Sequence, residues 1–510
     1  LKGLLAGLRR AARRCNVRCR VPRGPWGRVN GASAPRCARR GTCMDSFGWF
    51  HASEGTGDDH RISSLTDDYR ITGLTEAGEG FVELQVTEIG GDDFSILATP
   101  EDNVKALKAM VASHLDLSAC FDLTLLCGAE PLQDALLVSQ LPEQKLLAVP
   151  VRTLRIEAIG PDIPGDFKYL ARGVMAPNGS LYFAPHNAPR VLCIDPSSQA
   201  VEEVGPELKG ESKYSSGGVL GLDGRIYVAP YNAQRVLRID PFEQSVATVG
   251  PDLPGDFKYS ASGVLAPNGR IYFAPRNARN VLCVDPERQA VETLALDVKC
   301  SLKYAAGALL SDGRAYYAPR NAKQVLCVDP GRQSLELLGP ELAGEQKYLA
   351  GEAIARDGRA YFVPCNARQV MRIDPKTHGV DLIGPELLGT FKYVAGPVLA
   401  PSGRIYAAPH NAARVLCIDP ATESVRECGP ALPGECKYSA PGLLASDGRI
   451  YFAPYNAEHV LCIDPEAETV ELVGPALVGG YKYFAGGIAE RSGQIYFAPY
   501  SARQVLCIDA

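Results

Sequence analysis

The stretch IYFAPYNAEHVLCIDP at residues 450–465 occurs eight times, with small changes, in this 510-residue chain. Its tyrosine marks the register, and the equivalent residues are Tyr182, Tyr227, Tyr272, Tyr316, Tyr361, Tyr406, Tyr451 and Tyr496. The spacing is 45 residues with a single step of 44. A fixed period of this size is typical of solenoids and β-propellers.

Each repeat contains four short extended runs, which in the second repeat are Gly218 to Gly221, Ile226 to Ala229, Val236 to Ile239 and Val246 to Val249. None has the length or period of a helix. A dipeptide ending in Gly separates the first two runs: Asn178-Gly179, Asp223-Gly224, Asn268-Gly269, Asp312-Gly313, Asp357-Gly358, Ser402-Gly403, Asp447-Gly448 and Ser492-Gly493. Asn-Gly and Asp-Gly favour tight hairpin turns with positive φ at both central residues. Four antiparallel strands per repeat predict an all-β, eight-bladed β-propeller over residues 151–510.

The two ends of the repeat array complement each other. The eighth repeat stops after its third run, at Ala510, whereas residues 154–161 match the fourth run of the first repeat. We therefore expect strand 154–161 to complete the last blade, which would close the ring without exposed edges.

The repeat resembles the YVTN-type propeller repeats of surface-layer and related proteins. The matching segments are Ile450 to Asn456, with its Tyr-containing strand and Asn-containing turn, and Val460 to Pro465. This loose resemblance spans about 360 residues and implies a fold far more than an activity.

Residues 81–150 do not repeat and predict the order strand, strand, helix, strand, strand. The expected strands are Val82 to Thr87, Phe94 to Ala98, Leu123 to Cys127 and Lys145 to Val149, with a helix from Pro100 to about His114. The module resembles a small α+β ubiquitin-like (β-grasp) domain at Thr99 to Asp102, Asn103 to Ala106, Leu125 to Gly128 and Leu132 to Asp134.

The ubiquitin-like resemblance implies an apolar recognition patch at Ile89, Leu126 and Val149. The alternative is that these residues face the core of the module or the neighbouring propeller. Conjugation to a lysine is not expected, because no terminal Gly-Gly follows Val149.

Charge is distributed unevenly along the chain. Residues 1–43 hold eleven Arg and one Lys without an acid, so the net charge of −5 leaves −17 on the other 467 residues. The leader is either a translation artefact or disordered tail upstream of Met44, or an organelle transit peptide, and residues 44–80 are expected to be a flexible linker. The acidic body argues against nucleic-acid binding, and no run of eighteen apolar residues suggests a membrane span.

Six of the sixteen cysteines occupy one repeated strand position: Cys193, Cys283, Cys327, Cys417, Cys462 and Cys507. Arg238 and Arg372 fill that position in the other two repeats, so an obligatory disulfide is not expected there and a reducing compartment is favoured. Cys15, Cys19, Cys37 and Cys43 lack the close pairing of a zinc site, and no metal is predicted.

Two loops of each blade should emerge on one face of the ring, and they supply the candidate site residues. The loop between blades carries a lysine before a tyrosine: Lys168, Lys213, Lys258, Lys303, Lys347, Lys392, Lys437 and Lys482. These lysines would form a positive ring for an anionic ligand or an acidic protein segment, or each would pair locally with an acid while its tyrosine packs between blades.

The loop between the second and third strands reads Pro-x-Asn-Ala. The Asn is expected to stabilise its own turn. The x position varies among near-invariant neighbours: His186, Tyr231, Arg276, Arg320, Cys365, His410, Tyr455 and Tyr500. Such variation suggests a contact surface, since Tyr and Arg are common interface anchors, or else drift at an exposed site. On the opposite face, Arg residues after the hairpin turns and Asp residues after the third strands predict structural ion pairs.

The resulting hypothesis is a non-catalytic, monomeric cytoplasmic adaptor without a cofactor. Its propeller would bind a protein partner, and its ubiquitin-like domain would recruit ubiquitin–proteasome components. A metal-dependent lactonase-like hydrolase and a carbohydrate- or small-ligand-binding propeller are the alternatives. Glu352, in place of a small residue, breaks the repeat as a catalytic site would.

Overall fold

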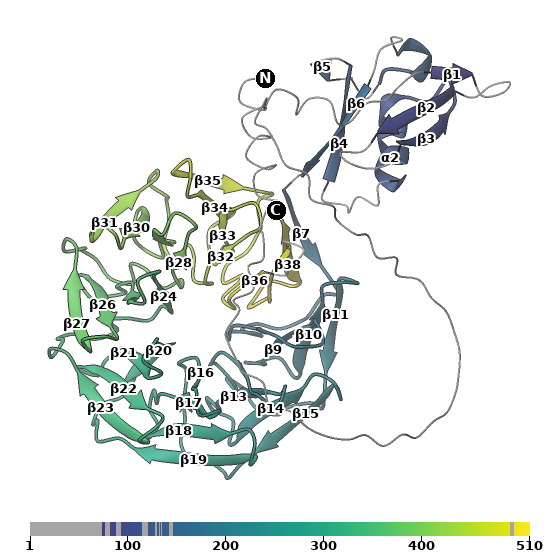
Figure 1. Cartoon of the computed structure of the whole chain (residues 1–510). Coiled ribbons are helices and arrows are strands. Elements are labelled where there is room, and N and C mark those ends of the chain that lie inside the picture. The colour runs from purple at the N-terminus through teal and green to yellow at the C-terminus, as the bar shows by residue number, and fades with distance from the viewer. Residues whose placement is uncertain are drawn as a thin grey trace, which may run out of the picture. The chain divides into compact units, whose positions relative to one another are not determined.

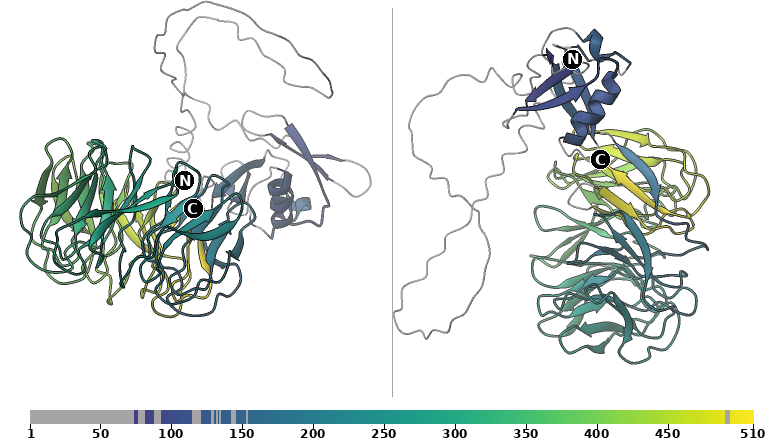
Figure 2. Two further views of the ribbon diagram at one scale, coloured as in Figure 1. Left: turned by 90° about the horizontal axis from the view of Figure 1, so that it is seen from below. Right: turned by 90° about the vertical axis from the view of Figure 1, so that its right-hand side faces the viewer.

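The computed structural model describes residues 74–76, 82–87, 93–114, 121–127, 130–131, 133, 135–141, 146–152, 154–489 and 494–510. Most of these form a ring of eight antiparallel sheets, as Figure 1 shows, and the part of the ring bounded by the innermost strands is here called the channel. The side views in Figure 2 show the strands of the ring running between its two faces. Among the described residues, no helix is long and apolar enough to cross a membrane.

Each sheet has four strands, numbered from the channel outward. The first four blades are β8 (Val174–Met175), β9 (Leu181–Phe183), β10 (Val191–Asp195) and β11 (Ala200–Val204); β12 (Val219–Leu220), β13 (Ile226–Val228), β14 (Val236–Asp240) and β15 (Ser245–Val249); β16 (Val264–Leu265), β17 (Ile271–Phe273), β18 (Asn280–Asp285) and β19 (Ala290–Ala295); β20 (Tyr304–Leu309), β21 (Ala315–Pro319), β22 (Val325–Asp329) and β23 (Ser334–Leu338).

The other four blades repeat this order. They are β24 (Glu352–Ile354), β25 (Ala360–Phe362), β26 (Val370–Asp374) and β27 (Gly379–Ile383); β28 (Val398–Leu399), β29 (Ile405–Ala407), β30 (Val415–Asp419) and β31 (Ser424–Cys428); β32 (Leu443–Leu444), β33 (Ile450–Phe452), β34 (Val460–Asp464) and β35 (Thr469–Val473); β36 (Ile488–Ala489), β37 (Gln494–Phe497), β38 (Val505–Asp509) and β7 (Arg155–Ile159).

The eighth blade confirms the predicted closure. Its outermost strand is β7, which pairs antiparallel with β38 so that Glu157 lies opposite Cys507. Segments about 350 residues apart thus share one sheet, and the ring has no unpaired edge at this junction.

The core lies between neighbouring blades. Second strands such as β9 are buried along their whole length, whereas in the outer strand β11 only Val201 is buried. The cluster around Tyr182 combines β9 and β10 with Tyr214, Ile226 and Leu237 of the next blade. Each blade therefore completes its core only against its neighbours, which makes the ring one cooperative body.

The hairpin between the first two strands differs from the predicted two-residue turn. In the first blade Gly179 has φ of 85°, whereas Asn178 is not in the positive-φ region. The amide of Gly179 donates to the carbonyl of Ala176, and the amide of Ala176 donates to the carbonyl of Ser180. This is a type I turn with a G1 bulge, and Pro177 favours it because its fixed φ suits the first central position.

The N-terminal module contains β1 (Leu74–Glu76), β2 (Val82–Thr87), β3 (Asp93–Ala98), α2 (Val104–His114), β4 (Phe121–Cys127), β5 (Glu130–Pro131), the 3₁₀ turn η1 (Val138–Gln140) and β6 (Leu146–Arg152). The strands form two three-stranded sheets, β1-β2-β3 and β5-β4-β6. The four expected strands and the helix occur in the expected order, and the short strands β1 and β5 are additional to the prediction. The ubiquitin-like assignment stays a prediction.

The helix of this module begins later than expected, at Val104 instead of Pro100. Asn103 Oδ1 accepts the amide of Ala106 and so acts as the N-cap. Asp102 instead closes the preceding turn by accepting hydrogen bonds from the amide and hydroxyl of Thr99.

Candidate binding face of the propeller

One face of the ring, here called the loop face, is formed by the interblade loops and the loops between second and third strands. In each blade the x residue of Pro-x-Asn-Ala donates its amide to the carbonyl of its own blade's loop lysine. The carbonyl of that x residue accepts the amide of the lysine in the next blade. Both bonds occur at all eight junctions, at 2.7 to 3.1 Å, and hold the loop face on a closed circle of backbone hydrogen bonds.

The loop lysines are not an exposed positive ring. All eight are only 1–4% exposed: Lys168, Lys213, Lys258, Lys303, Lys347, Lys392, Lys437 and Lys482. Their ammonium groups donate to backbone carbonyls, as when Lys258 Nζ reaches Gly255 O at 2.6 Å and Lys392 Nζ reaches Ala367 O of the preceding blade at 2.8 Å. Burial lowers the pKa of each lysine.

This result corrects both interpretations of the lysines. Their partners are backbone carbonyls of turns, not acids, and these carbonyls give the buried ammonium groups the hydrogen-bond acceptors that they need away from water. The paired tyrosines do pack between blades: Tyr169 belongs to a core cluster with Tyr496 and Val505 of the eighth blade.

The loop asparagines bond across the blade junction instead of within their own turn. Asn232 Oδ1 accepts the amide of Phe257, 25 residues away, at 2.8 Å. The same bond, at 2.8 to 2.9 Å, is made by Asn187, Asn277, Asn321, Asn366, Asn411 and Asn456. At the eighth position Ser501 Oγ is 3.5 Å from the Phe167 amide, so its junction has the longest of these bonds.

The residues that donate these amides form a second variable ring, which the repeat pattern did not single out. It directly precedes each lysine and has φ of 49–55° in every blade: Phe167, Ser212, Phe257, Leu302, Gln346, Phe391, Cys436 and Tyr481. Left-handed backbone at non-glycine residues costs about 1 kcal/mol or more each, and it also occurs in the turns between third and fourth strands, as at Gln199 and Gln244. In the sequence, this ring can be recognised as a variable position directly before each invariant Lys-Tyr pair.

The x-position side chains lie on the same face. His186, Tyr231, Cys365 and His410 are buried, whereas Arg276, Arg320, Tyr455 and Tyr500 are half-buried. Both histidines direct Nδ1 toward a carbonyl and a serine hydroxyl of the next blade, at 3.2 and 3.1 Å for His186. Burial lowers the pKa of both histidines, which are therefore neutral at pH 7, and no carboxylate partner of either is found within the described part.

Aromatic side chains gather over the seventh, eighth and first blades. The rings of Tyr455 and Tyr500 stack at 6.2 Å between centroids, and Tyr481 and Phe484 approach Tyr455 edge-on at 5.1 and 5.7 Å. Phe167 extends this group, with its centroid 5.0 Å from Tyr500. We call these five residues the aromatic sector.

Positive charge gathers over the third and fourth blades. The guanidinium of Arg276 lies 5.0 Å from the Tyr231 ring and 5.7 Å from the Phe257 ring, both within cation–π range. Its neighbour on the circle is Arg320 of the fourth blade. Burial and, second, the positive charge of Arg320 lower the pKa of Arg276 to about 10. Arg276 and Arg320 are here called the arginine pair.

The channel contains two charged residues at positions where other blades have small ones. Glu352 is the only charged residue in the described inner strands, and burial raises its pKa to about 7 while Arg172 of the first blade opposes this shift. The equivalent Gly173 has no room for a side chain, since its Cβ would lie 2.5 Å from Phe183. Arg172, aligned with Gly217 and Ser262, is a second break that the repeat pattern did not reveal.

The opposite face, here called the hairpin face, carries the predicted structural ion pairs. Arginines after the hairpin turns contact aspartates after the third strands at 2.8 to 3.5 Å: Arg225–Asp240, Arg270–Asp285, Arg314–Asp329, Arg359–Asp374, Arg404–Asp419 and Arg449–Asp464.

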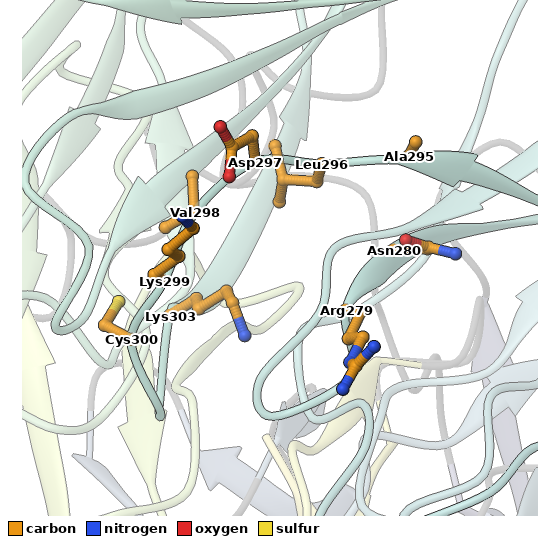
Figure 3. A pocket seen from close by; sticks show the side chains of 9 residues that line it. All are labelled: Arg279, Asn280, Ala295, Leu296, Asp297, Val298, Lys299, Cys300 and Lys303. Atoms are coloured by element: carbon orange, nitrogen blue, oxygen red, sulfur yellow. The ribbon is translucent and has the colours of Figure 1, made fainter.

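An open groove of about 760 Å³ lies at the junction of the third and fourth blades. Figure 3 shows its nine lining residues, which come from Arg279–Asn280 and from residues 295–303. Other blades leave the outer strand through a Gly-Pro pair; Gly205, for example, has φ of 80° and lies against Val246 of the next blade. Ala295 replaces that glycine, and because a side chain disfavours this backbone conformation the chain takes another path.

The remaining predicted features fall on the N-terminal module or involve cysteine. Ile89 lies outside the described residues; Leu126 lies on β4 opposite Leu147, and Val149 on β6 opposite Thr124. The ten cysteines in the described residues of the propeller are free thiols. The described residues contain no group of three or more His, Cys, Asp or Glu side chains placed to hold a metal ion.

Solved structures resemble this chain at the level of fold. The Dos1 propeller matches with a TM-score of 0.50 and 12% identity, over 69% of this chain and 95% of that one. A virginiamycin B lyase of Staphylococcus aureus has a TM-score of 0.46 and 11% identity, over 70% and 99%. The hydrazine synthase of Kuenenia stuttgartiensis has a TM-score of 0.41 and 15% identity, over 69% and 97%.

No family model and no curated protein matches the sequence. The match to the Dos1 propeller concerns the fold alone at such identity. The chain is an eight-bladed β-propeller with solved propellers among its structural neighbours.

Proposed function

We propose that the protein is a non-catalytic scaffold whose propeller binds a protein partner on its loop face. The observation that carries this proposal is the combination of a rigid, eightfold-repeated backbone circle with two rings of side chains that change from blade to blade. A constant frame with variable side chains is the arrangement expected of a contact surface.

The side-chain types support a protein partner. Phe167, Phe257 and Tyr481 are 39–49% exposed, although aromatic rings of this size usually lie inside a protein. Aromatic and arginine side chains dominate the binding energy of protein interfaces because they bury much surface with few rotatable bonds. The loop face is also preorganised, so binding requires little ordering of its backbone.

The channel offers less support for the hydrolase alternative. A lactonase-like metal site needs several inward carboxylates around a divalent ion, whereas the described inner strands contribute Glu352 alone. The carbohydrate-binding alternative draws on the aromatic sector, since stacked tyrosines also suit sugar rings, and it is an outcome of the test below.

The second half of the proposal concerns the N-terminal module and rests on its resemblance to ubiquitin. Ile89, Leu126 and Val149 would form the patch that recruits ubiquitin–proteasome components. The scaffold would then bring a propeller-bound partner to that machinery in the cytoplasm.

The test is affinity capture from cell lysate with the full chain and three variants. Tyr455→Ser/Tyr500→Ser alters the loop face, Phe242→Ser alters the hairpin face at a residue 67% exposed, and Leu126→Ser/Val149→Ser alters the predicted patch. We expect the first variant to lose a specific set of proteins, the second to keep it, and the third to lose ubiquitin-pathway proteins alone.

Two results would contradict the scaffold. One is equal recovery of all proteins with the wild type and with Tyr455→Ser/Tyr500→Ser. The other is a chain that retains no protein but carries a stoichiometric divalent ion, which would establish the enzyme in its place. Retention of glycans that depends on Tyr455 would favour the carbohydrate-binding alternative.

A further inference from the structure

We propose that the arginine pair, Arg276 and Arg320, is an anion-recognition site for the carboxylates of an acidic peptide segment, an inference that rests on the proposed loop-face function. The pair is set in the third and fourth blades at equivalent positions of adjacent loops. Each backbone is fixed by the circle of hydrogen bonds described above.

The charge of this pair is uncompensated within the described part of the chain. No described carboxylate forms an ion pair with Arg276, and no described residue accepts a hydrogen bond from its guanidinium. Arg320 has one such contact, from Nη2 to Gln346 Oε1 at 3.3 Å. By contrast, six repeated arginines of the hairpin face each contact an aspartate.

Both guanidinium groups are also partly removed from water. The Nε atoms of Arg276 and Arg320 are buried and lack a partner. Burial is the largest cause lowering the pKa of both side chains. Two neighbouring cations with unused donors in a partly dry site are costly, and an oxyanion that accepts from both removes this cost.

The aromatic neighbours hold one arginine in place before any ligand arrives. Arg276 lies over the rings of Tyr231 and Phe257, which restricts the guanidinium plane and leaves less side-chain entropy to lose on binding. Exposed Arg279 and Lys299 at the adjacent groove extend the positive charge outward, against the single acid Asp297.

The opposite side of the loop face indicates a peptide instead of a small ion. The third and fourth blades lie across an eight-membered ring from the seventh and eighth, which carry the aromatic sector (Figure 1). A ligand that uses both must present carboxylates at one end and apolar or aromatic groups at the other. A peptide segment spans the channel mouth and carries both chemistries, whereas an inorganic anion does not.

The experiment selects a randomised twelve-residue peptide display library on the full chain. We expect enriched peptides to carry Asp or Glu, and their Glu→Gln or Asp→Asn versions to bind about tenfold or more weakly, as for a charge-assisted contact. Arg276→Met/Arg320→Met should lose the same affinity. The control Arg288→Met/Arg332→Met removes equal charge from exposed residues of the hairpin face and should change the dissociation constant less than about twofold.

Arg276→Lys/Arg320→Lys keeps the charge and the fold while removing the planar fork, and it should lose part of the affinity. The proposal is overturned if enriched peptides lack acids, if their acids do not depend on the arginine pair, or if only inorganic phosphate binds there. A partner that needs Tyr455 and Tyr500 but no acid would refute this inference and leave the scaffold standing. A lysate without any loop-face-dependent partner would refute the scaffold itself.

Discussion

Glu352 should make the propeller less stable as the pH rises, and Glu352→Gln should remove that dependence. The carboxyl is half-buried in the innermost strand of the fifth blade, and burial raises its pKa from 4.5 to about 7. A raised pKa means that the folded state binds the proton more tightly than the unfolded state. Its contribution to stability is therefore full below pH 4.5 and is lost as the pH rises to about 7.

The size of the effect follows from the shift. Each pKa unit corresponds to about 1.4 kcal/mol, so the change from 4.5 to about 7 sets an upper bound of about 3.5 kcal/mol. Because Glu352 is only half-buried, solvent screens part of its charge and reduces the expected loss to about 1–3 kcal/mol. Glutamine has the same shape without the charge and should escape this loss.

The assay is urea unfolding followed by far-ultraviolet circular dichroism, with wild type and Glu352→Gln compared between pH 4.5 and 8. We expect similar free energies of unfolding at the acidic end and a more stable variant at pH 8. The control Glu336→Gln changes an exposed glutamate of the outermost strand β23. A stability difference that does not change with pH, or a less stable glutamine variant at pH 8, would refute the burial of this carboxyl.

Three substitutions test the interblade contacts by the same unfolding measurement. Lys258→Met removes the buried ammonium that donates to Gly255 O and should cost about 1–3 kcal/mol, whereas Lys323→Met on the surface should change little; equal effects would contradict the buried role of the loop lysines. Gly205→Ala combines strain at φ of 80° with a Cβ 2.5 Å from a valine, whereas Gly210→Ala at φ of 95° meets nothing within 4 Å, so the first should be clearly the more destabilising. Ser501→Asn should strengthen the one long bond of its ring and stabilise the protein by about 0.5–1.5 kcal/mol; a destabilised variant would show that the asparagine bond is not the reason for the repeat.

Local features of the repeat predicted the blades well. Period, alternation and the Gly-containing turns are properties of a few neighbouring residues, and the closing strand β7 could be recognised because it copies the fourth run of another repeat. The turn type was wrong because Asn178-Gly179 fits both a two-residue turn and the bulged turn observed, in which only the glycine has positive φ.

The partners of the loop residues could not be predicted from the repeat alone. Lys258 and Asn232 both bond to backbone groups, and the amide that Asn232 accepts lies 25 residues away in the loop that leads to the next blade. A repeated Lys or Asn therefore looks the same in the sequence whether it faces solvent or seals a junction. Arg172 escaped notice because its position tolerates several small residues, so one substitution does not stand out.

The most direct test of the loop-face proposal is photocrosslinking from single positions on the two faces. A benzophenone amino acid would replace Tyr481, 49% exposed on the loop face, or Phe242, 67% exposed on the hairpin face, in the full chain expressed in cells. The proposal predicts a crosslinked protein partner from position 481 and none from position 242. Crosslinking of the same partner from position 242 alone, or from both equally, would contradict binding at the loop face.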